Sequence, residues 1–564
     1  MPENSNYIAV TIGPVLDTIN LASSPSALWA ASYMMSMLSK NICSALVDSG
    51  IPETDIVSPY FDTSDKLIDR NDGVGLFHDR VIFKADNFDI KNFPAIRDKA
   101  IEKTVEYFGF TDKDKEYFKD YFLVSAVLLE NSTNLIMDSS KKLDCLELAK
   151  RFVSSQNSNP ILSFYNSEDI TTSPSKNDAI RIQVTKEMKM SQWQLLGSNR
   201  EKIRSIPDIA RGHGDEKKWK KYNYYAVVRS DGDRITKIIE KLKPDEIRGF
   251  SKKCMKYCSD IADKVHKDYG GVTIYSGGDD LLALMPVEYE SKEGIKNIFE
   301  FTKEANEDFI QTFKNPNQEE NDGIAKDPEN PSQDVSLSFG IFVAYNAFPL
   351  YEALEQSADL LFGVAKNIKN CVAICFQKHS GQSEGLMIYN KALGNYIKFH
   401  NDCLNIKKDD EKTDKKVKKS PEDKEKEELE ENRIIFSAMH KFALYKKFFE
   451  NAKDDNEIKN IFRNVFDSDF QKYNHFLQDS LCKFYLKIFH GLAVRTLSEH
   501  GLYKEKKLVR FREKDENAPQ IFYKVKCKKT ERVYGRKYKS NYALKMEYIL
   551  RIIKFFKEKA GDGE

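Results

Sequence analysis

Two short apolar runs on either side of a Gly-Gly-Asp-Asp turn constrain the fold of this chain more than any other feature. The runs are residues 271–276 and 281–285, the turn is 277–280, and both runs are rich in residues that favour β-strands. A tight glycine turn between such runs predicts a β-hairpin with two carboxylates at its tip. Glycines let a bulky ligand approach the backbone, and paired carboxylates bind hard divalent cations. The tip therefore suggests a metal site, although the same four residues, taken alone, also suit an ordinary solvated loop.

A second acidic position lies upstream, at the end of the apolar run 224–233. This run closes with Asp-Gly-Asp at 231–233 and is followed by isoleucines at helical spacing. The 49 positions from Asp231 to Asp280 accommodate one long helix and one strand. Because consecutive elements tend to be neighbours in space, we expect Asp231 to face Asp279 and Asp280 across adjacent strands.

Three carboxylates within reach of one another repel strongly unless cations neutralise them. Two Mg²⁺ or Mn²⁺ ions bridging Asp231, Asp279 and Asp280 would serve phosphoryl transfer, by holding the attacking oxygen and a triphosphate together. These three aspartates are the candidate catalytic and metal-binding residues.

The segment around these acids predicts a βαββαβ order over about 221–390. A strand is expected at 335–344, a helix at 349–366 and a further strand at 371–376. The polar stretch 314–334 is expected to be a surface insertion. The order is that of a ferredoxin-like split βαβ sheet, an α+β fold.

These motifs resemble the palm domain shared by nucleotide cyclases and polymerases, with 357–366 as its third matching segment. The N-terminus narrows the resemblance. Residues 11–15 and 27–33 resemble the opening of the large subunit of type III CRISPR effector complexes of the Cmr kind. In that family a Gly-Pro-Val strand end leads into a helix carrying Leu-Trp-Ala-Gly-Ser; here Ala31 replaces the glycine. Residues 206–210 also resemble the family.

The resemblance covers most of 6–50 and 200–395 and implies two ferredoxin-like palm domains plus a C-terminal helical domain. The first strand ends in Gly13-Pro14 and carries no acid, so the first palm is expected to be degenerate and the second catalytic. In the family, target RNA bound by the complex switches on polymerisation of ATP into cyclic oligoadenylates. The implied partners are crRNA, target RNA and the other subunits, and ATP is the implied substrate.

The same resemblance assigns residues that lie near the nucleotide. Lys366 matches a lysine that contacts triphosphate in related diguanylate cyclases, but a lone lysine on an amphipathic helix is equally a solvated helix end. The neighbouring Asp231 suffices as a ligand, which weakens the case for Asp233 in that role. The expected nucleotide-binding residues are Ser230, Gly232, Asp233, Ser276, Gly277, Gly278 and Lys366.

Many large subunits of this family carry an N-terminal HD nuclease domain with several metal-binding histidines. The first 200 residues contain one histidine, His78, which cannot build such a site. The His78-Asp79 pair is interpreted as accidental. We expect no DNase activity, and RNA cleavage would belong to other subunits.

Composition agrees with these expectations. The formal net charge is +1 with 31% charged residues, so any RNA contact must come from local patches. No run approaches the length of a membrane helix and no secretory leader opens the chain, which predicts a cytoplasmic protein without membrane contact. The nine cysteines show no paired zinc spacing and are expected to be buried small hydrophobes.

Four domains are expected: a palm-like domain with helical insertions over 1–200, the catalytic palm over 201–395, a charged disordered linker over 396–432, and a mainly helical domain over 433–564. The most charged part of the linker, 407–431, holds almost nothing to bury and predicts a disordered loop or a solvated helix extension. The helical domain resembles the family's C-terminal domain, which docks on small subunits. Its expected apolar face comprises Ile434, Ile435, Phe436, Met439, Phe442, Tyr445, Phe448 and Phe449.

The segment 504–539 holds 14 Lys or Arg against 5 Asp or Glu, interleaved with aromatic residues. This combination suits single-stranded RNA, through phosphate contacts and stacking. A β-hairpin with a solvated basic face, or a contact for acidic neighbours, explains it equally well.

Two alternatives to the cyclase stay open. The same palm site in some relatives is thought to join ATP to S-adenosylmethionine, and the surroundings of Ser230 and Asp233 do not exclude this product. A non-catalytic scaffold whose palm only binds nucleotide or RNA is the other alternative. A free-standing diguanylate cyclase fits less well, because the N-terminal motif and the C-terminal helical region would have no role there.

Overall fold

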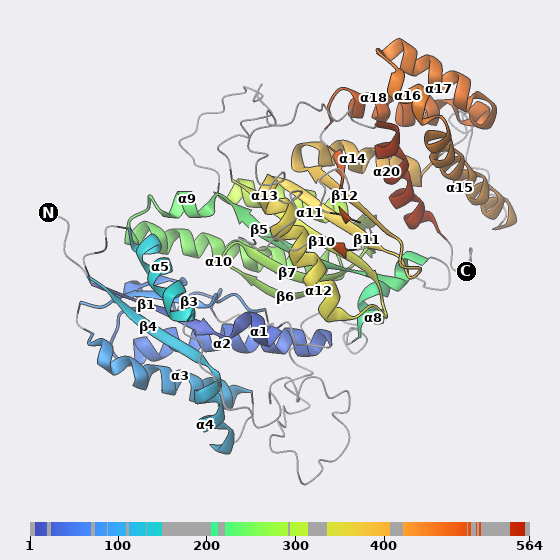
Figure 1. Cartoon of the computed structure of the whole chain (residues 1–564). Helices are drawn as coiled ribbons and strands as arrows, with labels where there is room; N and C mark the ends of the chain where they lie inside the picture. The colour runs from blue at the N-terminus through green and yellow to red at the C-terminus, as the bar shows by residue number, and fades with distance from the viewer. Residues whose placement is uncertain are drawn as a thin grey trace, which may run out of the picture. The chain divides into compact units, whose positions relative to one another are not determined.

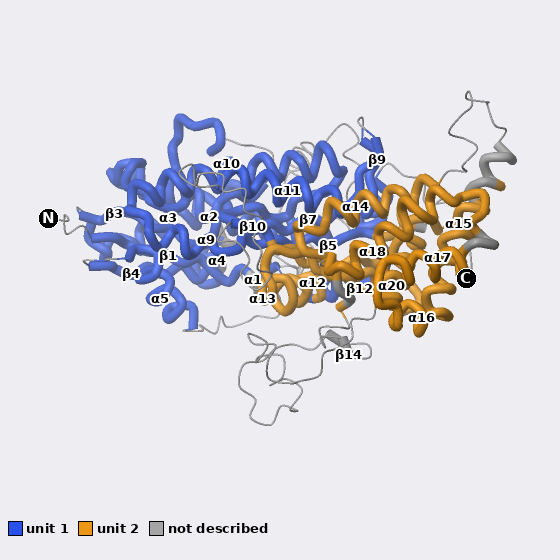
Figure 2. The backbone as a smooth tube through the Cα atoms, turned by 90° about the horizontal axis from the view of Figure 1, so that it is seen from above, with its two compact units in different colours: residues 1–213, 225–337, 346–355 blue, residues 214–224, 338–345, 356–564 orange. Residues whose placement is uncertain are grey.

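The computed structural model divides the chain into two compact units (Figure 2). Unit 1 comprises residues 1–213, 225–337 and 346–355, and unit 2 comprises 214–224, 338–345 and 356–564. The structure describes residues 6–19, 24–68, 74–86, 88–108, 112–130, 132, 134–148, 205–212, 220–291, 294–313, 335–406, 421–492, 494–497, 503–504, 507–508 and 542–558.

The N-terminal part of unit 1 is a four-stranded sheet with a βαββαβ order (Figure 1). Its strand order is β2-β3-β1-β4, and every neighbouring pair is antiparallel. This is the ferredoxin-like arrangement expected for the first palm. Its elements are β1 (Tyr7–Gly13), α2 (Pro25–Asp48), β2 (Ile56–Ser58), β3 (Arg80–Lys84), α3 (Phe93–Tyr107) and β4 (Leu123–Leu129).

Strand β1 lies at the centre of this sheet because it has apolar side chains on both faces. Ile8, Ala9 and Val10 are completely buried. Helix α5 (Leu135–Glu147) follows β4 and is capped by Asn134, whose side chain accepts a hydrogen bond from the amide of Met137. The shorter elements around the sheet are α1 (Val15–Ile19), η1 (Glu53–Asp55), η2 (Ile90–Asn92), α4 (Asp112–Tyr121) and α5 (Leu135–Glu147).

The second palm repeats the same order. Strand β5 pairs antiparallel with β7, and β7 pairs antiparallel with β6. The strand order of the whole sheet is β13-β12-β11-β10-β5-β7-β6, and its part from β10 to β6 has the ferredoxin-like order. The elements of this βαββαβ part are β5 (Tyr224–Asp233), α10 (Pro244–Lys267), β6 (Val272–Gly277), β7 (Asp280–Pro286), α11 (Ile298–Phe313) and β10 (Ser336–Tyr345).

Three further strands extend the sheet beyond β10 and lie in unit 2. Strand β11 runs parallel to β10, as expected for two strands joined by a helix, and β12 and β13 continue antiparallel. The segments of this extension are α12 (Leu350–Ala358), the π-helical η5 (Asp359–Ala365), α13 (Lys366–Ile368), β11 (Cys371–Gln377), β12 (Ser383–Tyr389), α14 (Asn390–Leu404) and β13 (Val494–Thr496). Short elements elsewhere are α8 (Ile206–Arg211), η4 (Lys220–Asn223), α9 (Ile235–Ile239), β8 (Glu288–Ser291) and β9 (Gly294–Asn297).

Within unit 1, helix α10 of the second palm is bound by the N-terminal segment 56–65. The Arg248 guanidinium donates to the backbone carbonyls of Ile56 and Phe61 at 2.7 and 2.8 Å. Lys252 forms an ion pair of 2.8 Å with Asp65, and both cations lie over the ring of Tyr60. Ile247 of α10 joins one apolar cluster with residues of β1, β3, β4 and α5. The two palms therefore share a core within this unit.

The C-terminal helices of unit 2 form around an aromatic cluster. The ring of Phe442 contacts those of Phe449, Phe462, Phe466 and Tyr485, with ring centroids 4.9 to 5.9 Å apart. These contacts confirm helical packing over much of 433–500. The elements are α15 (Pro421–Leu444), α16 (Lys446–Asn451), α17 (Asp455–Phe470), η7 (Gln471–Tyr473), η8 (Phe476–Cys482), α18 (Lys483–Phe489) and α20 (Tyr542–Lys557).

Several expectations need correction. The segment 396–432 is not one disordered linker, because α14 runs to Leu404 and α15 begins at Pro421. The charged residues of 421–432 are accommodated as a helix extension, since Glu and Lys are strong helix formers. Phe436 and Phe448 do not belong to the buried face, since they are 37% and 63% exposed, and α15 ends before Phe448. Helix α11 was not predicted.

Other expectations have different outcomes. Seven of the eight described cysteines are buried as expected, but Cys145 is exposed. The compact units do not follow the expected boundaries at 200 and 395, because unit 1 combines the first sheet with β5, β6 and β7. The insertion 314–334 and residues 407–420 lie outside the described residues, as does most of the basic segment 504–539. At its start, β14 (Tyr503–Lys504) and β15 (Lys507–Leu508) pair antiparallel.

Candidate metal and nucleotide site

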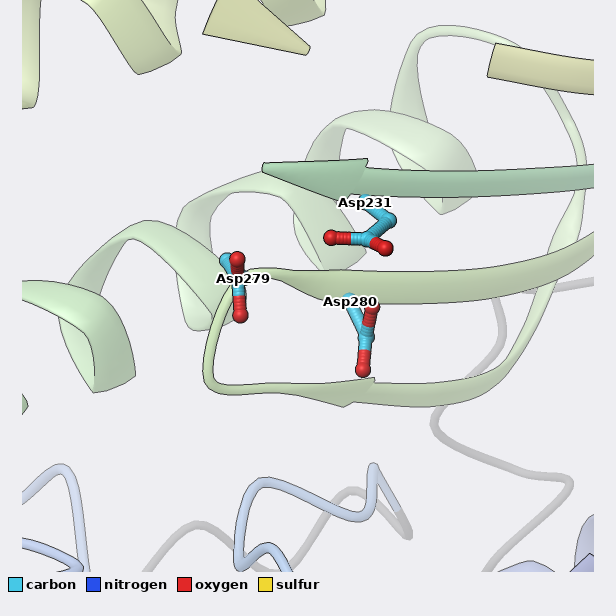
Figure 3. A group of neighbouring side chains, drawn as sticks. All are labelled: Asp231, Asp279 and Asp280. Atoms are coloured by element: carbon cyan, nitrogen blue, oxygen red, sulfur yellow. The ribbon is translucent and has the colours of Figure 1, made fainter. Parts of the chain in front are cut away.

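Asp231 lies near the end of β5, where the strand passes beside the beginning of β7 (Figure 3). In the β5–β7 ladder Ser230 is opposite Leu281, and in the β6–β7 ladder Gly277 is opposite Asp280. Because side chains alternate along a strand, Asp231 and Asp280 leave the face opposite to that of Ser230 and Leu281. The register thus explains why an acid from β5 meets an acid from β7.

The turn between β6 and β7 has two central residues, Gly278 and Asp279. Gly278 has a φ of 69°, a conformation that glycine adopts without steric cost. A positive φ at the first central position fits the type II′ hairpin turn, whose twist matches that of the flanking strands. The hairpin predicted from the two apolar runs is confirmed, with Asp279 at its tip and Asp280 as the first residue of β7.

The structure brings Asp231, Asp279 and Asp280 together. Each offers a carboxylate oxygen, and these oxygens all lie within 4.8 Å of one another. Asp231 and Asp279 are half-buried, and Asp280 is exposed, so solvent reaches the group at Asp280. Among the described residues it is the one cluster of three or more His, Cys, Asp or Glu side chains that could hold a metal ion. An all-carboxylate donor set suits Mg²⁺ or Mn²⁺ rather than a softer metal.

Gly232 allows Asp279 to approach β5. A Cβ at position 232 would lie 2.6 Å from the Oδ2 atom of Asp279 and 2.8 Å from a side-chain carbon of Ile235. Both separations are shorter than any van der Waals contact. The space beside β5 is therefore occupied by the Asp279 carboxylate, and any larger residue at 232 would displace it.

Gly277 makes room for a second side chain in the same way. A Cβ at position 277 would lie 2.5 Å from the hydroxyl oxygen of Tyr275, so the phenol ring lies over the glycine of the turn. Burial, together with the charges of Asp280 and Asp279, raises the pKa of Tyr275 well above its usual value. The hydroxyl therefore stays protonated and offers a hydrogen-bond donor at the turn.

A half-buried cation belongs to the same face of β5. Arg229 precedes Asp231 by two residues, so the two side chains leave the strand on the same side. Burial lowers the pKa of Arg229 to about 10, and the charge of Asp280 acts against this shift. The guanidinium remains charged at neutral pH and offsets part of the repulsion among the acids. The sequence analysis did not identify Arg229 as a residue of the site. The one signal for it is a cation within an otherwise apolar strand.

The side chains of three expected nucleotide-binding residues point elsewhere. Asp233 is 1% exposed and its Oδ2 accepts a hydrogen bond of 2.9 Å from the Ser336 hydroxyl. Ser276 is completely buried, and its hydroxyl donates to the backbone carbonyl of Cys258 in α10 at 3.0 Å. Ser230 is buried on the face opposite to that of Asp231. Nucleotide contact by these residues stays a prediction without side-chain support.

Lys366, the remaining candidate, begins α13 and lies in unit 2. The acids lie in unit 1, so the expected contact of Lys366 with a triphosphate also stays a prediction.

In the first palm, a hydrogen bond of 3.1 Å joins His78 and Ser58. Burial and the charge of the nearby Arg80 lower the pKa of His78 to about 4. No helix of the described residues is long and apolar enough to cross a bilayer.

Two family matches fall on the two palms. Residues 7–108 match the family described as CRISPR-associated protein Cmr2, N-terminal. Residues 224–373 match Cas10/Cmr2, second palm domain, and contain all three aspartates of the site. The first match contains β1 with the Gly-Pro-Val strand end and α2 with the Leu-Trp-Ala segment that carried the resemblance.

Individual proteins are also similar to parts of this chain. The Cmr2 subunit of the Cmr CRISPR system of Pyrococcus furiosus is 34% identical over 113 residues, which are 20% of this chain and 11% of that protein. A solved Csm1–Csm4 cassette in complex with cA4 has a TM-score of 0.42 and 13% identity, over 70% of this chain and 58% of that one. A Csm1–Csm4 subcomplex of the type III-A interference complex has a TM-score of 0.41 and 14% identity, over 65% and 54%.

The aligned regions thus span only part of each relative. The two family matches are nevertheless in the order that the palm motifs require, and the second contains the acidic hairpin. The two palms of this chain, residues 7–108 and 224–373, are therefore those of the Cas10/Cmr2 family.

Proposed function

We propose that this chain is the nucleotidyltransferase subunit of a type III CRISPR ribonucleoprotein and that target RNA activates it to convert ATP into cyclic oligoadenylates. The observation that carries the proposal is the convergence of the three carboxylates at the tip of the second palm. The match of the second palm to the Cas10/Cmr2 family supports the reaction class. Other subunits, crRNA and target RNA are the proposed partners.

The three aspartates would hold divalent cations, which supply the charge that stabilises a transferring phosphoryl group and orient its oxygens. Asp231 would bind these cations from β5, and Asp279 and Asp280 would bind them from the hairpin. The glycines of the turn leave its backbone accessible to phosphate oxygens. Arg229 keeps the local charge from becoming fully anionic and so lowers the cost of gathering three carboxylates.

The attacking group would be the 3′-hydroxyl of one ATP and the electrophile the α-phosphorus of another, with pyrophosphate leaving. Positioning and electrostatics account for most of the catalysis in phosphoryl transfer, so no covalent protein intermediate is required. The residues of this chain bind and orient the reactants in this scheme.

Reconstitution with guide RNA, target RNA, ATP and Mg²⁺, followed by mass spectrometry of the nucleotides, tests the proposal. We expect cyclic oligoadenylates in the presence of target RNA, and none when Asp279 and Asp280 are both replaced by Ala, with complex assembly unchanged. A parallel reaction with S-adenosylmethionine separates the adduct-forming alternative. A fully assembled wild-type complex that yields no nucleotide product would contradict the proposal and favour a scaffold.

A further inference from the structure

Helix α10 contacts the turn that carries Asp279 and Asp280. The thiol of Cys258 donates a hydrogen bond to the backbone carbonyl of Gly278, with a sulfur–oxygen distance of 3.3 Å. The backbone carbonyl of the same residue accepts the hydroxyl of Ser276 at 3.0 Å. Cys258 is thus hydrogen-bonded to both neighbours of Gly277, and the second of them, Gly278, directly precedes Asp279.

We infer that Cys258 is a positioning residue for the Asp279–Asp280 turn: its two hydrogen bonds fix the turn at the separation from β5 that lets the three carboxylates share divalent cations. This inference rests on the proposed metal site and names the part of the fold that holds it.

The turn needs such a support. Gly278 has no side chain and an open surrounding, since a Cβ built there would meet no atom within 4 Å. Glycine also has the greatest backbone freedom of any residue. Packing at this position therefore does not fix this part of the turn, and the Cys258 thiol supplies a side-chain hydrogen bond to it.

The Cys258 thiol is suited to hold this position. Cys258 is 1% exposed, and burial raises the pKa of its thiol to about 12, so it stays protonated and can donate. A buried hydrogen bond of this kind is screened little by water. Helix α10 is itself anchored, because Arg248 and Lys252 bind the segment 56–65.

A natural control lies one helical turn earlier. Cys254 is also buried, at 7% exposure, and belongs to the same helix. Among the described residues no hydrogen bond joins Cys254 to the turn. Cys254→Ala and Cys258→Ala remove the same atoms from the same helix, so their comparison isolates the bond to Gly278 from the loss of packing.

The experiment measures Mn²⁺ binding to the purified full chain by electron paramagnetic resonance, together with thermal unfolding. The variant with Asn at positions 231, 279 and 280 defines binding outside the site. We expect Cys258→Ala to weaken Mn²⁺ binding about three- to tenfold, the effect of losing one buried hydrogen bond. Ser276→Ala should act in the same direction, and Cys258→Ser, which keeps a donor, should recover most of the affinity. Cys254→Ala should lower thermal stability and leave the Mn²⁺ affinity unchanged.

Equal Mn²⁺ affinities for Cys258→Ala and Cys254→Ala would overturn the inference, as would Cys258→Ser behaving like Cys258→Ala. Wild-type binding no stronger than that of the three-Asn variant would overturn the metal site and the inference together. Strong wild-type binding without nucleotide synthesis by the reconstituted complex would remove the proposed function while the positioning role stands.

Discussion

At the scale of single residues, the site depends on positions where a side chain is excluded. Gly232 and Gly277 carry no chemistry of their own, yet the Asp279 carboxylate and the Tyr275 hydroxyl occupy the space beside them. The geometry of the acids is therefore set by two glycines as much as by the aspartates. Substitution of a glycine tests this without removing any ligand.

Gly232→Ala is expected to reduce nucleotide synthesis by about 100-fold, as for other changes that misplace a group near the chemistry by about 1 Å. The reason is that the new methyl group displaces Asp279 and separates the three carboxylates. Initial rates at saturating ATP over a range of Mg²⁺ concentrations measure the effect, and excess Mg²⁺ should restore part of it.

Gly249→Ala is the matched control, since a Cβ at position 249 on α10 meets nothing within 4 Å. Alanine in a helix interior should stabilise the chain by roughly 0.5–1 kcal/mol and leave the rate unchanged. A Gly232→Ala enzyme as active as the wild type would show that Asp279 does not need its observed place.

Asp233→Asn separates a structural acid from a catalytic one. The Asp233 carboxylate accepts the Ser336 hydroxyl in a buried site, so the change should lower stability by about 1–3 kcal/mol. Mn²⁺ affinity should remain within about twofold of the wild-type value, because Asp233 lies outside the acid cluster. Calorimetric unfolding and Mn²⁺ titration measure the two effects; a large loss of Mn²⁺ binding in a stable variant would return Asp233 to the list of ligands.

At the scale of elements, helix α10 connects the two palms. Its first half binds the segment 56–65 through Arg248 and Lys252, and the thiol of Cys258 in its second half donates to Gly278 in the turn before Asp279. The helix begins with Pro244 in its first turn, and the Glu246 side chain accepts from the amide of Lys243. Both features hold its N-terminal end in place.

Arg248→Met is expected to destabilise the chain by about 2 kcal/mol, because two charge-assisted hydrogen bonds to buried carbonyls and one contact with the Tyr60 ring are lost. Lys256→Met on the same helix is the control: its ion pair with Asp260 is exposed and contributes about 0.5 kcal/mol or less. Thermal unfolding distinguishes the two variants. Equal losses of stability would show that the contacts of Arg248 with the segment 56–65 add no stability.

Local patterns in the sequence were enough to predict the elements of the second palm other than α11. Strand β5, the β6–β7 hairpin and the order of helix and strand between Asp231 and Asp280 follow from apolar periodicity and turn residues. The meeting of the three acids then follows from the strand register. Similarity to the family extended this to the first palm, whose own strand β1 carries no acid.

The contacts that hold the site could not be predicted in this way. Cys258 appeared only as one of several apolar helix residues, and its thiol bond to Gly278 depends on how α10 lies on the sheet. The interaction of Tyr60 with Ser251 joins residues 191 positions apart, which no local period encodes. The sequence reasoning also did not predict helix α11, although its phenylalanines are buried.

At the scale of the whole molecule, stability should fall at acid pH, because histidine is buried in the neutral form. His400 is completely buried in unit 2, and burial lowers its pKa to about 4 from a usual value near 6.5. The unfolded chain therefore binds this proton more readily, and stability present above pH 6.5 is lost as the pH falls toward 4.

His400→Phe should reduce this pH dependence. Phenylalanine keeps the ring contact that His400 makes with Phe556, at a centroid distance of 4.6 Å, and cannot be protonated. From pH 7 to pH 5 the wild type should lose about 2 kcal/mol more stability than the variant, from a shift of about 2.5 pH units. Thermal unfolding at the two pH values measures the difference; parallel losses would show that His400 does not titrate on unfolding.

The binding of residues 56–65 to α10 also has a consequence during translation. Tyr60 leaves the ribosome 191 residues before the Ser251 that its amide binds. At a translation rate of about 5–20 residues per second, α10 follows the segment 56–65 after roughly 10–40 s. Throughout that interval the face that later receives Ile247 is bare on the nascent chain, so synthesis of this subunit creates a period in which chaperone capture competes with aggregation.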